Sequence, residues 1–144
     1  MKRSDLALAM LGLAEGHPYT PAQIQKALFL VTRNLPQVVS RGSGYDFQPY
    51  DYGPFDKSVY ADLRDCARRG LATIEDSPGA RWPEYRATSQ GVAIARELVS
   101  GLPPNHAAYL KEVSDWVRSL TFSQLVSAIY KAYPETKVNS VFTG

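Results

Sequence analysis

Residues 71–91 read LATIEDSPGARWPEYRATSQG, and this stretch decides the expected fold. Two short runs with β-strand character, Leu71–Glu75 and Tyr85–Thr88, flank the turn-forming segment Asp76-Ser77-Pro78-Gly79. The pattern predicts a two-stranded antiparallel hairpin. Thr88 then stands where the N-cap of a following helix belongs, so a helix is expected directly after the hairpin.

Three helices are expected ahead of this hairpin. The first covers about Ser4–Ala14, and the second begins after Thr20, which has the spacing of a capping box with Gln23. The third covers Gly53–Gly70, with Pro54 in its first turn. Helix, helix, helix and hairpin is the element order of a winged helix-turn-helix. We therefore expect a mainly α fold with a small two-stranded β-hairpin.

The winged-helix domain is expected over residues 1–101, and residues 102–144 form a C-terminal helical extension. Two further helices are expected there, one from about Asn105 to Leu120 and one that begins after Thr121. They either complete the core of the same domain or form the seam of a homodimer. Residues 37–52, ahead of the third helix, are expected to form a loop whose second half is extended and anchored by aromatic side chains.

Composition narrows the class of protein. The chain has 144 residues, of which 44% are apolar, which is enough for the core of one domain. A net charge of +2 permits a local nucleic-acid patch without requiring one. The single cysteine, Cys66, excludes an internal disulfide and a Cys-rich zinc site. No run approaches the roughly 18 apolar residues of a membrane span, so we expect a cytoplasmic protein without a membrane partner.

Three short motifs resemble known families. Residues 85–91, YRATSQG, resemble the Tyr-x-Leu-Thr-x-x-Gly segment that closes the wing in PadR- and MarR-type regulators, with Ala87 in place of the usual Leu. Tyr52-Gly53-Pro54-Phe55, which leads to Val59, Tyr60 and Leu63, resembles the helix start of Panacea-type antitoxin domains and of the uncharacterised YwgA-like proteins. Residues 129–135, IYKAYPE, also look YwgA-like. The resemblance implies a winged helix with an antitoxin-like or defence-accessory role.

Cations gather along one edge of the expected third helix. Val59 and Leu63 lie at the centre of its apolar stripe. At about 100° per residue, Lys57, Arg64 and Arg68 fall almost opposite that stripe. In a winged helix this helix normally enters the major groove. With the hairpin, it predicts a DNA-binding set of Lys57, Ser58, Arg64, Arg68, Arg81 and Arg86.

Acidic residues on the same helix argue for a different interpretation. Asp56, Asp62 and Asp65 each repel a phosphate backbone, which counts against tight DNA binding. The alternative is therefore a solvated face whose charges pair within the helix.

Aromatic residues alternate with polar ones ahead of the third helix and also have two interpretations. They either anchor a long loop to the core or form an exposed surface for a protein partner. Trp82, in the hairpin connection, is either a contact residue or packs on the underside of the wing. The candidate partner-binding set is Tyr45, Phe47, Tyr50, Tyr52 and Trp82.

Catalytic and metal-binding patterns are weak. His17 and His106 each lie beside a helix-breaking proline, as solvent-exposed or capping residues, and no nucleophile motif accompanies them. Cys66 falls on the inner stripe of the third helix, which predicts a buried thiol. We therefore expect a protein that is not an enzyme, with no metal and no cofactor.

Two functions follow from these features. The first is a non-enzymatic regulator that binds duplex DNA, as a homodimer, through the third helix and the wing. The second is a protein-interaction module on the same fold, with the aromatic loop and Trp82 as its contact surface.

Overall fold

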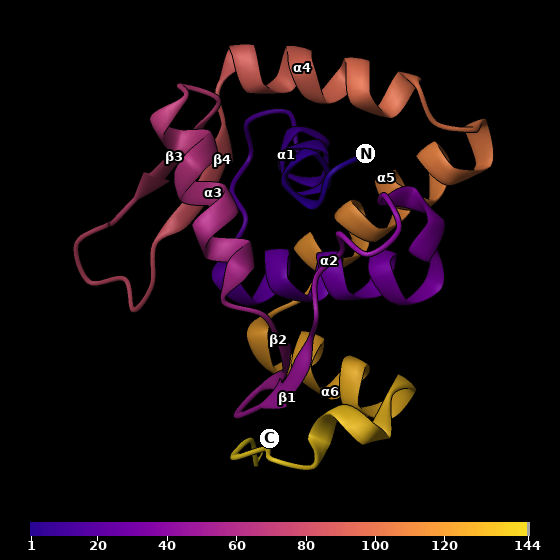
Figure 1. The fold of residues 1–144 in the computed structure, drawn as a ribbon. Coiled ribbons are helices and arrows are strands. Elements are labelled where there is room, and N and C mark those ends of the chain that lie inside the picture. Colours follow the sequence, from indigo (N-terminus) through magenta and orange to yellow (C-terminus); the bar gives the residue numbers. More distant parts are fainter. Residues whose placement is uncertain (144) are drawn as a thin grey trace.

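The computed structural model describes residues 1–143 and is mainly α, with two small two-stranded antiparallel sheets (Figure 1). Three α-helices, α1 (Arg3–Gly12), α2 (Pro21–Asn34) and α3 (Ser58–Arg68), precede the hairpin of β3 (Ala72–Glu75) and β4 (Glu84–Ala87). This is the element order of a winged helix-turn-helix, as the sequence predicts.

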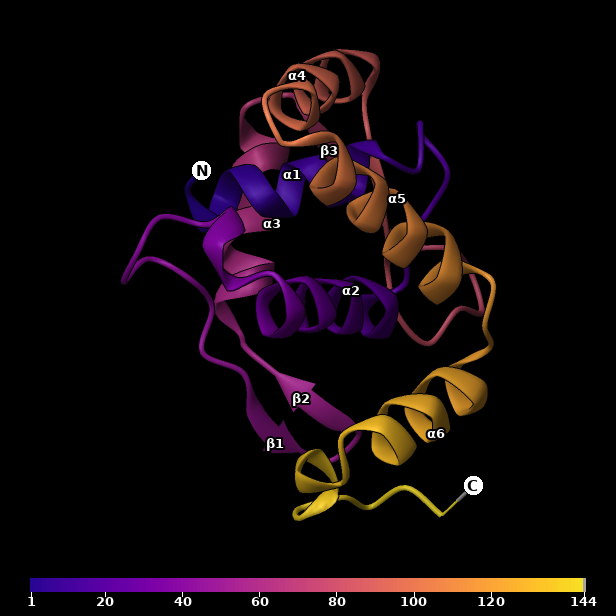
Figure 2. The same ribbon diagram turned by 90° about the vertical axis from the view of Figure 1, so that its right-hand side faces the viewer.

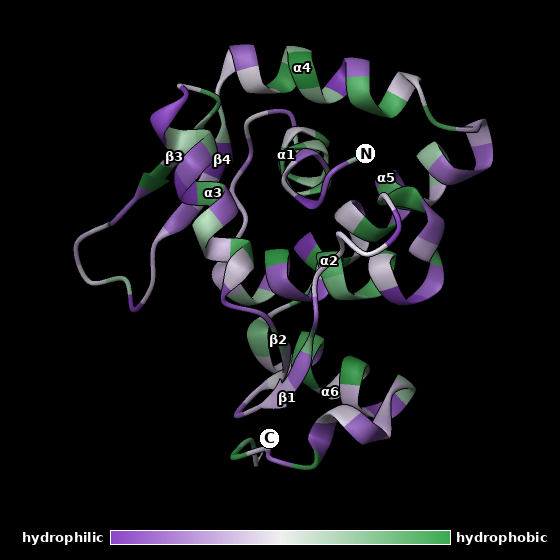
Figure 3. Ribbon diagram, viewed as in Figure 1, coloured by the Kyte–Doolittle hydropathy of each residue, from purple (hydrophilic) through white to green (hydrophobic). Residues whose placement is uncertain are grey.

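Helix α1 lies at the centre of the molecule, and every residue from Leu6 to Gly12 is buried. Figure 1 shows α1 end-on, with α2 below it, α3 beside it and α4 (Ser89–Ser100) above it. Figure 2 shows that α5 (Pro104–Arg118) closes a further side. The ribbon of α1 is mostly hydrophobic in Figure 3. Its side chains therefore form the middle of the core.

Helix α2 begins where the sequence predicts. The Gln23 N–H donates to Thr20 Oγ1 at 3.2 Å, and the Thr20 N–H donates to Gln23 Oε1 at 2.9 Å, which completes the capping box. Just before this cap, Tyr19 pairs with Tyr85 of β4 through two backbone hydrogen bonds of 2.8 and 2.9 Å. The chain that enters α2 is thus fastened to the hairpin.

The predicted hairpin is confirmed, with strands paired from Ala72 opposite Ala87 to Glu75 opposite Glu84. Thr88 caps α4 by accepting a hydrogen bond of 3.1 Å from the Gly91 N–H. A Cβ atom on Gly91 would lie only 1.9 Å from the carbonyl oxygen of Leu71, at the base of the hairpin. Only glycine therefore allows the start of α4 to lie this close to β3.

The connection between α2 and α3 contains more regular structure than expected. After a 3-10 turn over Pro36–Val38, β1 (Gln48–Tyr50) and β2 (Gly53–Phe55) form a second antiparallel hairpin. The expected extended half of the loop is therefore strand β1. Its partner is β2, the segment that was expected to begin the third helix.

That predicted helix start at Gly53-Pro54 is wrong. Gly53 has a φ of 104°, which no right-handed helix allows, and Phe55 is still paired with Gln48. Helix α3 begins at Ser58, whose N–H donates to Asp56 Oδ1 at 2.8 Å. An aspartate two residues ahead of the helix, rather than a proline in its first turn, marks its start.

The last two helices both pack against α2. Helix α5 runs along α2, and α6 (Phe122–Ala132), followed by a 3-10 turn over Pro134–Lys137, lies against α2 and β2 (Figure 2). Thr121 and Gln124 form the second capping box that their spacing predicts. None of the helices within residues 1–143 is long and apolar enough to cross a membrane.

Replacing Gly91 by Ala is expected to lower the free energy of unfolding by about 2–4 kcal/mol, because the Leu71 oxygen belongs to the backbone and cannot turn aside. Gly101→Ala is the matched control, since its nearest neighbour would lie at an ordinary 3.5 Å. Urea unfolding followed by circular dichroism measures both variants. Equal stabilities of the two variants would contradict the close packing at Gly91.

Candidate functional site

The side chains of Lys57, Arg64 and Arg68, here called the cationic edge, are all exposed. Helix α3 buries the opposite stripe, which includes Val59 and Leu63, against the core. The Arg68 side chain is 71% exposed, so neither α5 nor α6 covers this edge. The orientation of α3 about its own axis, with the apolar stripe inward and the cations outward, is therefore the one that the sequence predicts. Ser58 flanks this edge and is half-buried.

Two of the three aspartates near this edge are held by other groups. The Asp62 carboxylate accepts hydrogen bonds from Arg3 Nε at 3.1 Å and from the Tyr45 hydroxyl at 2.6 Å. Its side chain is only 15% exposed. Asp56 accepts from the Ser58 N–H on one oxygen and from a second backbone N–H on the other. Both carboxylates thus stabilise the fold, and the charge of Asp62 is offset by Arg3, whereas Asp56 has only neutral donors and keeps its negative charge.

Asp65, the third of these aspartates, interacts with the edge itself. It binds Arg68 at 3.1 Å and Arg69 at 3.6 Å. All three side chains are at least 45% exposed, so these pairs are weak and easily exchanged for another anion. Of the three cations of the edge, Arg68 therefore forms the ion pair within the helix that one of the two interpretations expects. No ion pair within residues 1–143 involves Lys57 or Arg64.

The two arginines expected on the wing differ in their surroundings. Arg81 lies exposed in the loop that projects from the body between β3 and β4 (Figure 1). Arg86 is half-buried at the root of the hairpin, where it donates to the Gly16 carbonyl at 3.2 Å and lies 3.5 Å from Glu84. The charge of Arg64 on α3 offsets part of the rise that burial causes in the pKa of Tyr85 on β4.

The aromatic set divides into core anchors and exposed residues. Tyr45 is buried, and Phe47 packs edge-to-face on Phe29 with ring centroids 5.8 Å apart. Burial raises the pKa of the Tyr45 hydroxyl, and its hydrogen bond to Asp62 raises it further. Tyr45 and Phe47 therefore anchor the loop to the core and do not form an exposed surface. The exposed members of the set are Tyr50 at 52%, Tyr52 at 45% and Trp82 at 39%.

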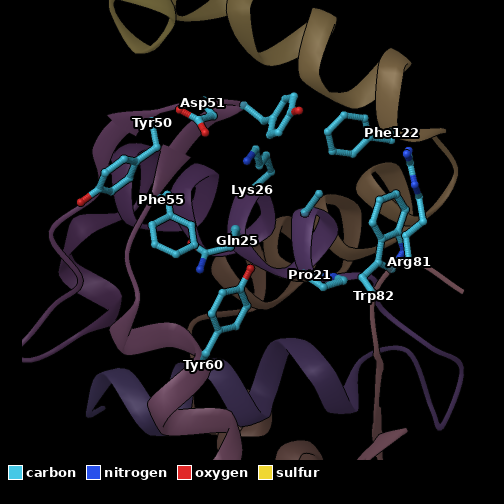
Figure 4. Close-up of a pocket in the computed structure, with 13 residues that line it drawn as sticks. Pro21, Gln25, Lys26, Tyr50, Asp51, Phe55, Tyr60, Arg81, Trp82 and Phe122 are labelled. Carbon is cyan, nitrogen blue, oxygen red and sulfur yellow. The ribbon is translucent and has the colours of Figure 1, made fainter. Parts of the chain in front are cut away.

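These exposed aromatics line a cavity of about 490 Å³, here called the aromatic pocket, between α2, the β1–β2 hairpin, α6 and the β3–β4 loop. Figure 4 shows Tyr50 and Phe55 on one side and Trp82 with Phe122 on the other. Trp82 stacks on Phe122 of α6 with ring centroids 5.8 Å apart, and so does not pack on the underside of its own hairpin. Tyr60 of α3 lines the pocket as well, so five segments of the chain build it.

Lys26 of α2 rises into the middle of this pocket (Figure 4). Its side chain is almost fully buried, and its only hydrogen bond among residues 1–143 is a long one of 3.4 Å to the Pro54 carbonyl. Burial lowers its pKa from 10.5 to about 8. At pH 7 the amine is still protonated, so the pocket contains a cation.

Nothing in the sequence of α2 distinguishes Lys26, because it lies outside the apolar stripe of the helix. Its neighbour Gln25 is buried as well and exchanges two hydrogen bonds with the backbone of Asp56. Both residues are covered by segments that come much later in the chain. No local pattern in α2 indicates that cover.

Side chains with catalytic potential are not assembled at either surface. Cys66 is buried, as its place on the helical stripe predicts, and burial raises the pKa of its thiol to about 11. A thiol in this state is a poor nucleophile. His17 is exposed and His106 half-buried. Residues 1–143 contain no group of three or more His, Cys, Asp or Glu side chains placed to hold a metal ion.

No protein-family model matches the chain, and no curated protein matches it.

Lys26→Met is expected to raise the free energy of unfolding at pH 7 by about 1–3 kcal/mol, because it removes a buried cation that lacks a carboxylate partner. The folded-state pKa of about 8 lies below the unfolded value of 10.5, so wild-type stability rises with pH between these values. The gap between variant and wild type therefore closes over this range.

Denaturant titrations from pH 7 to pH 10.5 measure this gap. Exposed Lys111, replaced by Met, serves as the control and leaves the pH dependence of the wild type unchanged. A gap between Lys26→Met and wild type that does not change with pH would show that the Lys26 amine is not held away from water.

Proposed function

We propose that this chain is a winged-helix regulator that binds duplex DNA and acts without catalysis. The observation that carries the proposal is the exposed cationic edge of α3, which lies beside a projecting hairpin. Helices in this position of the fold enter the major groove, and the hairpin contacts the adjacent backbone. Such a regulator works where the DNA is, in the cytoplasm.

Each cation has a role in this arrangement. Arg64 and Lys57, which form no ion pair within residues 1–143, contact base edges and phosphates first. Arg68 exchanges its exposed pair with Asp65 for a phosphate. Arg81 contacts the backbone from the wing loop, while Arg86 steadies the root of the hairpin. The ion pair of Asp62 with Arg3 reduces the repulsion that this aspartate would exert on a phosphate.

A homodimer is part of the proposal, because two copies can read two half-sites of a palindromic operator. Trp116 on α5 is 39% exposed and marks a surface suited to the contact between copies. Sedimentation of the wild type and of Trp116→Ala tests this part. A wild-type protein that stays monomeric at high concentration would remove the dimer from the proposal.

A second candidate function is a protein-interaction module of the antitoxin type, which the resemblance to Panacea-type domains implies. The exposed Tyr50, Tyr52 and Trp82 favour it, because aromatic residues are enriched at the centres of protein interfaces. Purification of the protein from its own cells distinguishes the two functions. A co-purifying polypeptide with no nucleic-acid absorbance supports the module, whereas bound DNA that salt releases supports the regulator.

Charge reversal at Arg64 or Arg68 is expected to weaken binding to a random-sequence duplex by about 10-fold or more, since each variant replaces an attraction to phosphate by a repulsion. The slope of log affinity against log salt becomes shallower by about 1–2 for each variant. Fluorescence anisotropy at several salt concentrations measures both quantities.

Arg96→Glu is the matched control, because it makes the same change in net charge on α4, at a side chain that is 70% exposed. We expect its DNA affinity to stay close to that of the wild type. Unchanged affinity in both Arg64→Glu and Arg68→Glu, with the fold intact by circular dichroism, would refute DNA binding through this edge.

A further inference from the structure

The aromatic pocket contains a cation whose hydrogen-bonding capacity is largely unused. An ammonium group has three N–H donors, and Lys26 uses one of them in a long bond of 3.4 Å to the Pro54 carbonyl. None of the ion pairs formed by residues 1–143 includes it. Its side chain is only 4% exposed, so water does little to solvate the charge.

Backbone also lies close to this amine. Gly53 lies beside it, so that a Cβ atom there would stand 3.6 Å from Lys26 Cε and 3.9 Å from Nζ. Asp51 also lines the pocket, but its carboxylate forms no ion pair with Lys26. A buried charge without a partner is unfavourable in the protein alone, and an anionic ligand would supply the missing partner.

The walls of the pocket determine the shape of such a ligand. Phe55 and Tyr60 meet with ring centroids 5.6 Å apart, and Trp82 stacks on Phe122 across the pocket from Phe55 (Figure 4). Flat rings present π-faces that pack against another flat ring. The volume of about 490 Å³ lies within the range of small-molecule sites.

We propose that the aromatic pocket binds a small flat aromatic molecule that carries one negative charge, with the anion on Lys26 and the ring between the aromatic walls. A single charge fits best, because one buried cation faces the anion and Asp51 repels a second negative charge. Arg81 at the mouth adds a weaker, solvent-screened attraction. Of the cations proposed to contact DNA, Arg81 lines the pocket, whereas Lys57, Arg64 and Arg68 do not, so ligand binding can be tested without DNA binding.

Two sources supply this chemistry: an aryl carboxylate, or a nucleotide with a single phosphodiester charge. The probes are therefore 2-naphthoate and 3′,5′-cyclic AMP, each compared with its neutral counterpart, 2-naphthamide or adenosine. Titration calorimetry on the wild-type protein is expected to show that at least one charged probe binds roughly 10-fold to 100-fold more tightly than its neutral counterpart. The probe that does so identifies the source.

Three variants test the assigned roles. Lys26→Met and Lys26→Gln are expected to abolish the preference for the charged probe, whereas Lys111→Met on the surface of α5 retains it. Phe122→Ala is expected to weaken the charged and neutral probes by the same factor, because it removes a wall and leaves the cation in place. Circular dichroism confirms that each variant is folded.

The proposal is overturned if neither charged probe binds more tightly than its neutral counterpart, or if folded Lys26→Met and Lys26→Gln keep the preference. Arg64→Glu in the same titration separates this result from the DNA-binding proposal. It is expected to bind the charged probe as the wild type does, even where it has lost affinity for DNA.

Discussion

The structure depends on a helix that has no side facing solvent. From Leu6 to Gly12 every residue of α1 is buried, so stability requires cover on all of its sides. Helices α2 and α3 and the hairpin cover part of it, and α4 and α5 close the remainder. A Cβ atom on Gly12 would collide with Ala95 of α4, which shows how closely the covering helix approaches. The first three helices and the helices after the hairpin thus pack around the same central helix and share one core.

This central burial leaves the outer surfaces of the covering elements available for binding. Helix α3 needs only one stripe to cover α1, so its cationic edge is free. The outer side of α2 is instead overlaid by the β1–β2 hairpin and by α6. That second layer does not close completely, and the aromatic pocket lies in the remaining space above Lys26.

Local signals in the sequence predicted the parts of the fold that local chemistry decides. The capping boxes at Thr20 and Thr121 are made within one turn of chain, and the close approach at Gly91 follows from its place after the hairpin. The predicted start of the third helix at Gly53-Pro54 was wrong, because a proline in the first turn of a helix and a proline in a short strand look alike in sequence. The Asx turn made by Asp56 ahead of Ser58 was the better signal. The aromatic pocket could not be predicted, because its five segments meet only through tertiary packing.

The β3–β4 loop connects the two candidate sites. Consecutive residues of this loop face different surroundings: Arg81 is exposed beside the pocket mouth, and Trp82 stacks on Phe122 of α6. Tyr60 of α3 lines the same pocket and stacks on Tyr85 of β4 with ring centroids 6.0 Å apart. The helix and the loop proposed to contact DNA therefore both contribute walls to the pocket. The shape of the pocket is therefore set by how the wing packs against α3 and α6.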